Sequence, residues 1–144
     1  MKRVEVLCAD DSAINRRFMA AMLERAGCVV HCVNDGMEAL ELISAHPLRF
    51  DLLITDHDMP RMTGLELITR LEELGFSGRI ILNSATINSE QLLPHAHRDF
   101  VTLLGKPVNP TILLATIADL GFGVVEEFEF DSPLTTARIT RAVA

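Results

Sequence analysis

The chain has 144 residues, of which 49% are apolar and 23% charged, and it carries a net charge of −7 at pH 7. This length and composition suit one ordinary globular domain and exclude an intrinsically disordered chain. The negative charge argues against binding to nucleic acid or to a membrane surface of anionic lipid, because both need a basic surface. No apolar segment approaches the length of a membrane-spanning helix, and Asp10 and Asp11 come too early for a signal peptide, so we expect a cytoplasmic protein.

Five short apolar runs alternate along the chain with longer stretches of helical periodicity. The runs, which we predict to be strands, are Val4–Ala9, Val29–Val33, Leu52–Thr55, Ile80–Leu82 and Phe100–Leu104. The predicted helices are Ser12–Ala26, Met37–Ala45, Gly64–Leu74, Ser89–His97 and Pro110–Leu120, and the fourth is weak because it contains Pro94. This alternation is typical of a doubly wound α/β domain, in which a parallel sheet carries helices on both faces.

The ends of two predicted helices carry residues suited to those positions. Ser12 is suited to cap the first helix and Gly27 to end it. Pro110 suits the first turn of the last helix, and Gly121 suits its end. These signals favour helix boundaries close to the ones given above.

Residues 121–144 fall outside the alternating pattern. Residues 124–130 alternate enough to predict a strand, and Ser132-Pro133 is a plausible start for a short helix over 134–143. We therefore divide the chain into a main domain, 1–120, and a C-terminal extension or linker, 121–144. The extension is a candidate for mediating association between copies of the chain.

Three cysteines, Cys8, Cys28 and Cys32, lie in apolar runs. We expect buried, reduced thiols, since three is an odd number and apolar surroundings are typical of free cysteine. Cys28 and Cys32 would share a face of a strand, but no second pair of ligands supports a zinc site.

Polar side chains follow four of the predicted strands. Asp10 and Asp11 come after the first strand, Asp56 after the third, Ser84 after the fourth and Lys106 after the fifth. Because the carboxyl ends of parallel strands open on one edge of a sheet, which is where doubly wound domains bind ligands, we expect these groups to converge.

Three nearby carboxylates repel one another unless a cation lies among them, and Mg²⁺ prefers oxygen ligands. A carboxylate beside Mg²⁺ can act as a nucleophile and form an aspartyl-phosphate. Ser84 could then donate a hydrogen bond to the phosphoryl group, and Lys106 could neutralise one of its oxygens. The sequence thus predicts a magnesium-dependent phosphorylation site at this edge of the sheet.

Four motifs in this order resemble the response-regulator receiver domains of two-component systems. They are Asp10-Asp11, the segment Asp56-His57-Asp58-Met59-Pro60 with Gly64, the pair Ser84-Ala85 and the pair Lys106-Pro107. The likeness covers about residues 3–120. It implies a flavodoxin-like (βα)5 sandwich whose parallel sheet has the strand order 2-1-3-4-5.

The resemblance also implies a role for each site residue. Asp56 would be the phosphoacceptor, and Mg²⁺ would be held by Asp10, Asp11, Asp56 and the backbone carbonyl of Asp58. Ser84, followed by Ala85, would be the switch hydroxyl. Lys106 would pair with Asp56 at rest and with the phosphoryl group afterwards. Pro107, after a cis peptide bond, and Gly64 would have structural roles.

The sequence departs from the family pattern at one position of the switch. The family usually carries Tyr or Phe three residues before the lysine, and here that residue is Leu103. The usual coupling between the switch hydroxyl and an aromatic ring is therefore in question. Asp58 and Thr86 stand at positions that influence how fast the phosphoryl group is lost in this family.

The leading hypothesis is a phosphoacceptor switch rather than an enzyme that turns over a substrate. Its donor would be a histidine kinase or a histidine phosphotransfer protein, and its output a protein–protein contact, including a phosphorylation-dependent homodimer. One alternative is a magnesium-dependent phosphohydrolase of the haloacid-dehalogenase type, suggested by Asp56-x-Asp58. Pro60 and the position of the pair after the third strand oppose that reading. A second alternative, supported by Leu103, is a degenerate receiver that serves as a constitutive scaffold.

Overall fold

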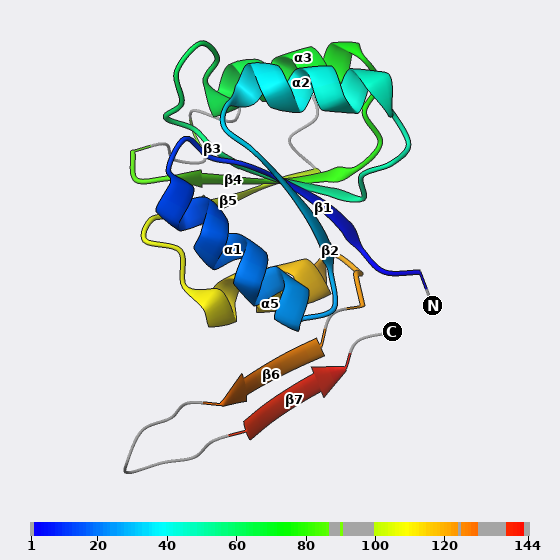
Figure 1. The fold of residues 1–144 in the computed structure, drawn as a ribbon, viewed down its shortest axis with the longest axis vertical. Helices are drawn as coiled ribbons and strands as arrows, with labels where there is room; N and C mark the ends of the chain where they lie inside the picture. The colour runs from blue at the N-terminus through cyan, green and yellow to red at the C-terminus, as the bar shows by residue number, and fades with distance from the viewer. Residues whose placement is uncertain (1, 87–89, 91–99, 124, 130–137, 143–144) are drawn as a thin grey trace.

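The computed structural model describes residues 2–86, 90, 100–123, 125–129 and 138–142. Its centre is a five-stranded parallel sheet in the order β2-β1-β3-β4-β5 (Figure 1), so the predicted fold class and strand order are confirmed. The strands are β1 Glu5–Ala9, β2 Val29–Val33, β3 Leu52–Asp56, β4 Arg79–Ser84 and β5 Val101–Gly105. Each overlaps its predicted run, because short β-branched and leucine-rich segments form strands that are buried on both faces of a parallel sheet.

Helices cover both faces of the sheet (Figure 1). α2 and α3 lie on one face, and α1 and α5 lie on the other. Their bounds are α1 Ala13–Arg25, α2 Gly36–Ala45, α3 Gly64–Glu73 and α5 Pro110–Asp119. The helix predicted over 89–97 lies outside the described residues, apart from Glu90.

The local signals at the ends of α1 act as predicted. The side chain of Ser12 accepts a hydrogen bond from the backbone N–H of Asn15 at 3.3 Å, which caps the helix. At the other end Gly27 has a φ of 91°, a left-handed conformation that glycine adopts without strain. This turn lets the N–H of Cys28 reach the carbonyl of Leu23 at 3.0 Å and leads the chain directly into β2.

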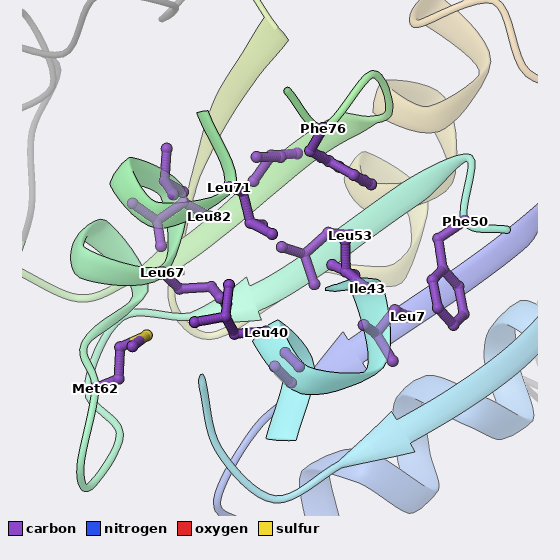
Figure 2. Packing of buried hydrophobic residues seen from close by; sticks show 14 of the residues in the cluster. Leu7, Leu40, Ile43, Phe50, Leu53, Met62, Leu67, Leu71, Phe76 and Leu82 are labelled. Carbon is purple, nitrogen blue, oxygen red and sulfur yellow. The ribbon is translucent and has the colours of Figure 1, made fainter. Parts of the chain in front are cut away.

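The sheet separates two apolar cores. Successive residues of β1 alternate between them, since Leu7 packs with α2 and α3 whereas Val6 and Cys8 pack with α1 and α5. Figure 2 shows the first of these cores, to which Leu53 of β3 and Leu67 of α3 both belong. All five residues of the central strand β3 are buried. The two cores hold the carboxyl ends of the strands in fixed positions relative to one another.

The C-terminal segment forms two strands. β6 (Val125–Glu129) and β7 (Arg138–Ala142) pair in an antiparallel two-stranded sheet, in which Phe128 is opposite Ile139. The strand predicted over 124–130 is therefore present, but the helix predicted over 134–143 is wrong for Arg138–Ala142. These residues bond to β6 instead of within a helix turn, and the β-branched Ile139 and Thr140 favour the extended backbone.

The prediction of buried thiols holds for two of the three cysteines. Cys8 and Cys28 are buried, but Cys32 is exposed, and all three are free. The reason lies in the tertiary structure: β2 is an edge strand, so an apolar run there is covered less completely than one in the middle of the sheet.

No helix in the described part of the chain is both long enough and apolar enough to cross a bilayer.

Candidate phosphoacceptor site

The predicted site residues come together at the carboxyl edge of the sheet. Asp10 and Asp11 follow β1, Asp56 and Ser84 are the last residues of β3 and β4, and Lys106 follows β5. The backbone N–H of Lys106 donates to the carbonyl of Ser84 at 3.2 Å, which continues the pairing of β4 and β5 past the end of the sheet. The convergence expected from the parallel arrangement is thus present in the structure.

Three carboxylates form a cluster suited to a cation. Asp10, Asp11 and Asp56 each offer an oxygen, and these oxygens all lie within 4.8 Å of one another. Burial raises the pKa of Asp10 above its ordinary value, opposed by the hydrogen bond that the backbone N–H of Ser12 donates to its carboxylate at 2.9 Å. The negative charge of Asp56 raises that pKa further. A divalent cation would relieve this repulsion, and an all-oxygen donor set fits Mg²⁺.

Asp56 is the most buried member of the cluster, with 3% of its surface exposed. Its Oδ1 lies 2.6 Å from Nζ of Lys106 and makes no other hydrogen bond among the described residues. An unpaired carboxylate at this depth would be unfavourable, so the ammonium balances its charge. Spare acceptor capacity on a buried carboxylate oxygen is what a metal ligand or a nucleophile needs, and it fits the cation expected here.

Ser84 is also 3% exposed, next to this ion pair. Its hydroxyl oxygen accepts a hydrogen bond from the backbone N–H of Thr86 at 3.1 Å, and it lies 3.4 Å from the hydroxyl of Thr86. Ala85 and Thr86 are exposed at the start of the following loop. The hydroxyl oxygen of Ser84 is therefore held in place by the loop that follows β4.

Gly64 brings the loop after β3 into close contact with the site. Its N–H donates to the carbonyl of His57 at 2.9 Å. A Cβ atom at this position would lie 2.6 Å from the carbonyl oxygen of Asp56 and 2.6 Å from a methyl group of Leu82. Only glycine fits without a shift of the backbone that carries Asp56, as expected for a structural residue.

Asp58 lies in the same loop with its side chain exposed. Its carboxylate is not a member of the three-carboxylate cluster. The expected contribution of its backbone carbonyl to a metal site stays a prediction.

Two residues that stabilise this loop were not anticipated from the sequence. Arg61, at a φ of 67°, donates from Nε to the carboxylate of Asp35 at 2.9 Å. Asp35 also accepts from the N–H of Glu38 at 3.0 Å and so caps α2. The capping signal was available, because an aspartate stands three residues before Glu38, but the pairing with Arg61 depends on the tertiary fold.

The remaining predicted positions lie in and beyond β5. The Lys106-Pro107 peptide bond is cis, as the resemblance implied. Leu103 is half-buried, is paired in register with Leu82, and packs against the core on the α2 and α3 side. A leucine thus occupies the position that is usually aromatic, and it is part of the packing between β5 and that core.

A cleft of about 520 Å³ opens beside the site, between α1 and the loop after β5. Asp10, Phe18, Lys106 and Pro107 are among the residues that line it. Phe18 is 49% exposed, and Ile14, one turn earlier on α1, is 79% exposed. Asp10 and Lys106 are therefore accessible from solvent through a cleft that the apolar ring of Phe18 helps to line.

Comparison with known proteins agrees with this geometry. Residues 6–118 match the sequence profile of the Response regulator receiver domain family. The chain is 33% identical over 111 residues to the two-component response regulator ORR11 of Oryza sativa, an alignment that covers 74% of this chain and 73% of ORR11. It is 30% identical over 143 residues to the sensory/regulatory protein RpfC of Xanthomonas campestris pv. campestris, which is 96% of this chain but 19% of RpfC.

Solved structures show the same fold. The chemotaxis protein CheY4 of Vibrio cholerae superimposes with a TM-score of 0.72 at 30% identity, and the alignment covers 82% of this chain and 98% of CheY4. A response regulator receiver protein of Pseudomonas putida gives a TM-score of 0.70 at 30% identity, with coverage of 83% and 98%. From the profile match over most of its length and from these relatives, the chain belongs to the response regulator receiver domain family of two-component systems.

Proposed function

We propose that this chain is a phosphoacceptor switch that is phosphorylated on Asp56 in the presence of Mg²⁺. The observation that carries the proposal is the environment of Asp56. It is a buried carboxylate at a strand end, paired with the ammonium of Lys106 at 2.6 Å and within 4.8 Å of the carboxylate oxygens of Asp10 and Asp11. One nucleophile, two further metal ligands and a fixed cation thus lie together beside a cleft that Asp10 and Lys106 help to line.

The residues divide the chemistry among them. A carboxylate oxygen of Asp56 attacks the phosphorus of the donor, a bond from oxygen to phosphorus forms, and the bond from phosphorus to the donor atom breaks. Bound Mg²⁺ would neutralise negative charge on the carboxylates and on the phosphoryl oxygens. Lys106 moves its ion pair from Asp56 to a phosphoryl oxygen, and the hydroxyl of Ser84 turns to donate a hydrogen bond to another.

The proposed donors are a histidine kinase or a histidine phosphotransfer protein, which would approach through the cleft that Phe18 helps to line. Ile14, exposed one turn earlier on α1, offers further apolar surface for that approach. The phosphoryl group then shifts an equilibrium between two conformations, and a downstream protein or a second copy of the chain binds one of them better. In this proposal the chain is not an enzyme that turns over a separate substrate. We also infer a cytoplasmic location, for which the three free cysteines give support.

A scaffold that needs no phosphorylation is the second candidate, and Leu103 favours it. With leucine packed at this position, no aromatic ring is available there to follow the hydroxyl of Ser84. The two candidates differ in whether Asp56 accepts a phosphoryl group, which can be measured directly.

The test is the mass of the intact protein after incubation with Mg²⁺ and acetyl phosphate. We expect one phosphoryl adduct that needs Mg²⁺, disappears in Asp56→Asn and persists in Asp51→Asn. Asp51 is the matched control because it precedes the same strand at the opposite edge of the sheet. An adduct that persists in Asp56→Asn would contradict the assignment of the site. Absence of any adduct, both with acetyl phosphate and with a phosphorylated histidine phosphotransfer protein, would favour the scaffold.

A further inference from the structure

Two of the cysteines lie opposite each other on neighbouring strands. Cys8 of β1 and Cys32 of β2 are partners in the parallel register, so their side chains leave the sheet on the same face. Paired strands are about 4.8 Å apart, and this separation is within the range of Cα distances found in disulfides.

The two thiols differ in accessibility. Cys8 is 2% exposed in the core beneath α1 and α5, whereas Cys32 is exposed on the edge strand. The thiol of Cys32 donates a weak hydrogen bond to the backbone carbonyl of Arg16 at 3.8 Å. One thiol of the pair can therefore meet a reagent from solvent, and the other lies directly behind it.

Electrostatics favours reaction at Cys32. The hydrogen bond from Cys8 lowers the pKa of Cys32 to about 7, with the guanidinium of Arg16 acting in the same direction against partial burial. A thiol with this pKa is substantially ionised at neutral pH, and the thiolate is the reactive form. By contrast, burial raises the pKa of Cys28 to about 11, so Cys28 is a built-in unreactive control.

We propose that Cys32 and Cys8 form a peroxide-responsive thiol pair that closes to an intramolecular disulfide. The thiolate of Cys32 attacks one oxygen of hydrogen peroxide, the oxygen–oxygen bond breaks, and Cys32 becomes a sulfenic acid with release of hydroxide. The sulfur of Cys8 then attacks the sulfur of Cys32, a sulfur–sulfur bond forms, and the sulfenic oxygen leaves with the proton of Cys8 as water. In total, two thiols and one peroxide give one disulfide and two waters.

The strand geometry makes this disulfide a reversible one. Directly opposed residues on parallel strands hold their Cβ atoms about as far apart as the strands, whereas a relaxed disulfide needs about 3.8 Å. Closing the bond requires a local shift of β2 against β1, and because β2 is an edge strand this shift disturbs its pairing with one neighbour only. Some strain remains, and a strained, exposed disulfide is readily reduced by thiols. Neither step requires phosphorylation of Asp56.

The experiment uses the full chain with stoichiometric hydrogen peroxide, followed by alkylation of the remaining thiols and peptide mapping. We expect an intact mass lower by two hydrogen atoms, a cross-linked pair of peptides containing Cys8 and Cys32, and full reversal by dithiothreitol. Cys28→Ser should behave as wild type, and Cys32→Ser should keep both remaining thiols open to alkylation after denaturation.

Two results would overturn the proposal. In the first, Cys32 is oxidised to sulfinic acid or to an intermolecular disulfide while Cys8 remains alkylated. In the second, peroxide leaves all three thiols unreacted. Cys8→Ala provides an independent check, because removal of the resolving thiol should let a sulfenic acid accumulate at Cys32, where dimedone traps it. This check requires that Cys8→Ala be folded, which its thermal unfolding shows. If the variant is not folded, the peptide map of the wild-type chain decides whether the disulfide forms.

Discussion

At the scale of single residues, the site is a charge balance between one lysine and three carboxylates. The Nζ of Lys106 is 2.6 Å from Oδ1 of Asp56, and the side chain of Lys106 is 28% exposed. The ammonium therefore neutralises a carboxylate that would otherwise be buried without a counter-charge. The same ammonium repels a divalent cation placed among the carboxylates, so the lysine and the metal compete electrostatically for Asp56.

Replacement of this lysine should separate its two effects. In Lys106→Met we expect Mg²⁺ to bind about tenfold more tightly, because repulsion from the ammonium is lost at a partly screened site. The yield of phosphoryl adduct should fall, because no fixed cation then pairs with the phosphoryl oxygens. Calorimetric titration with Mg²⁺ and intact-mass measurement check the two effects. Lys2→Met, at the other lysine of the chain, is the control and should match wild type. Unchanged or weaker Mg²⁺ binding in Lys106→Met would contradict this account.

At the scale of elements, the loop from β3 to α3 is attached to the rest of the molecule at two points. Gly64 contacts the end of β3 at the start of α3, and Arg61 links the loop to the capped start of α2 through Asp35. Because this loop follows Asp56 directly, its attachments help to fix the backbone that carries the carboxylate.

The close contact at Gly64 predicts a local steric effect. Gly64→Ala places a Cβ atom against the carbonyl of Asp56, which cannot rotate away, so we expect a loss of about 1–3 kcal/mol in the free energy of unfolding. Mg²⁺ binding should weaken as well, because Asp56 is displaced. Gly105→Ala is the matched control, since a Cβ atom there meets nothing within 4 Å. Chemical denaturation and Mg²⁺ titration of both variants give the comparison, and equal stabilities would refute the steric argument.

The ion pair at the start of α2 predicts a pH-dependent effect. Burial raises the pKa of Asp35, but hydrogen bonds from the N–H of Glu38 and from Arg61 outweigh burial and hold that pKa below its ordinary value of 3.8. The contribution of the charged form to stability is therefore complete above that value and disappears as the pH falls through the folded-state pKa.

Two substitutions at Asp35 separate its role as the cap of α2 from the contribution of its negative charge to stability. Asp35→Ala removes both and should cost about 1–2 kcal/mol at pH 7, whereas Asp35→Asn keeps a capping oxygen and should cost less. The difference in unfolding free energy between wild type and Asp35→Asn should shrink as the pH is lowered below about 4. Urea denaturation at a series of pH values provides the measurement. A difference that stays constant over this range would show that the charge of Asp35 does not contribute.

At the scale of the whole molecule, the receiver domain and the C-terminal hairpin are separate sheets. The two apolar cores are built from residues up to Phe122, which packs against the core on the α1 and α5 side. A chain that ends at Gly123 should therefore keep its unfolding midpoint within about 2 °C and accept a phosphoryl group at the same yield. A larger drop in the midpoint would show that the hairpin stabilises the domain.

Measurement of the solution mass of both chains tests the hypothesis that residues 121–144 mediate association.

Much of the fold and of the site could be predicted because the signals are local or follow from the parallel sheet. The apolar runs are dense enough to identify five strands, and Ser12 as a cap and Pro110 as a first-turn residue act within one helix turn. Asp10, Asp56, Ser84 and Lys106 could be grouped from sequence alone, because parallel strands all end on one edge.

The errors concern contacts between distant segments. The short stretch Arg138–Ala142 has no periodicity that separates helix from strand, and only pairing with β6 decides its structure. Exposure of Cys32 depends on the order of the strands, which places β2 at the edge. The pairing of Arg61 with Asp35 joins two loops that are far apart in sequence.

The sequence by itself determined the alternation of strands and helices, and with it which polar residues stand at strand ends, because hydrophobic period and capping act over a few neighbouring residues. Only the tertiary structure decided which of these groups touch. In the folded chain the ammonium of Lys106 pairs with Asp56, Cys32 is the register partner of Cys8, and Gly64 contacts the backbone of Asp56. Those contacts depend on strand order and on packing between elements, which are properties of the whole chain.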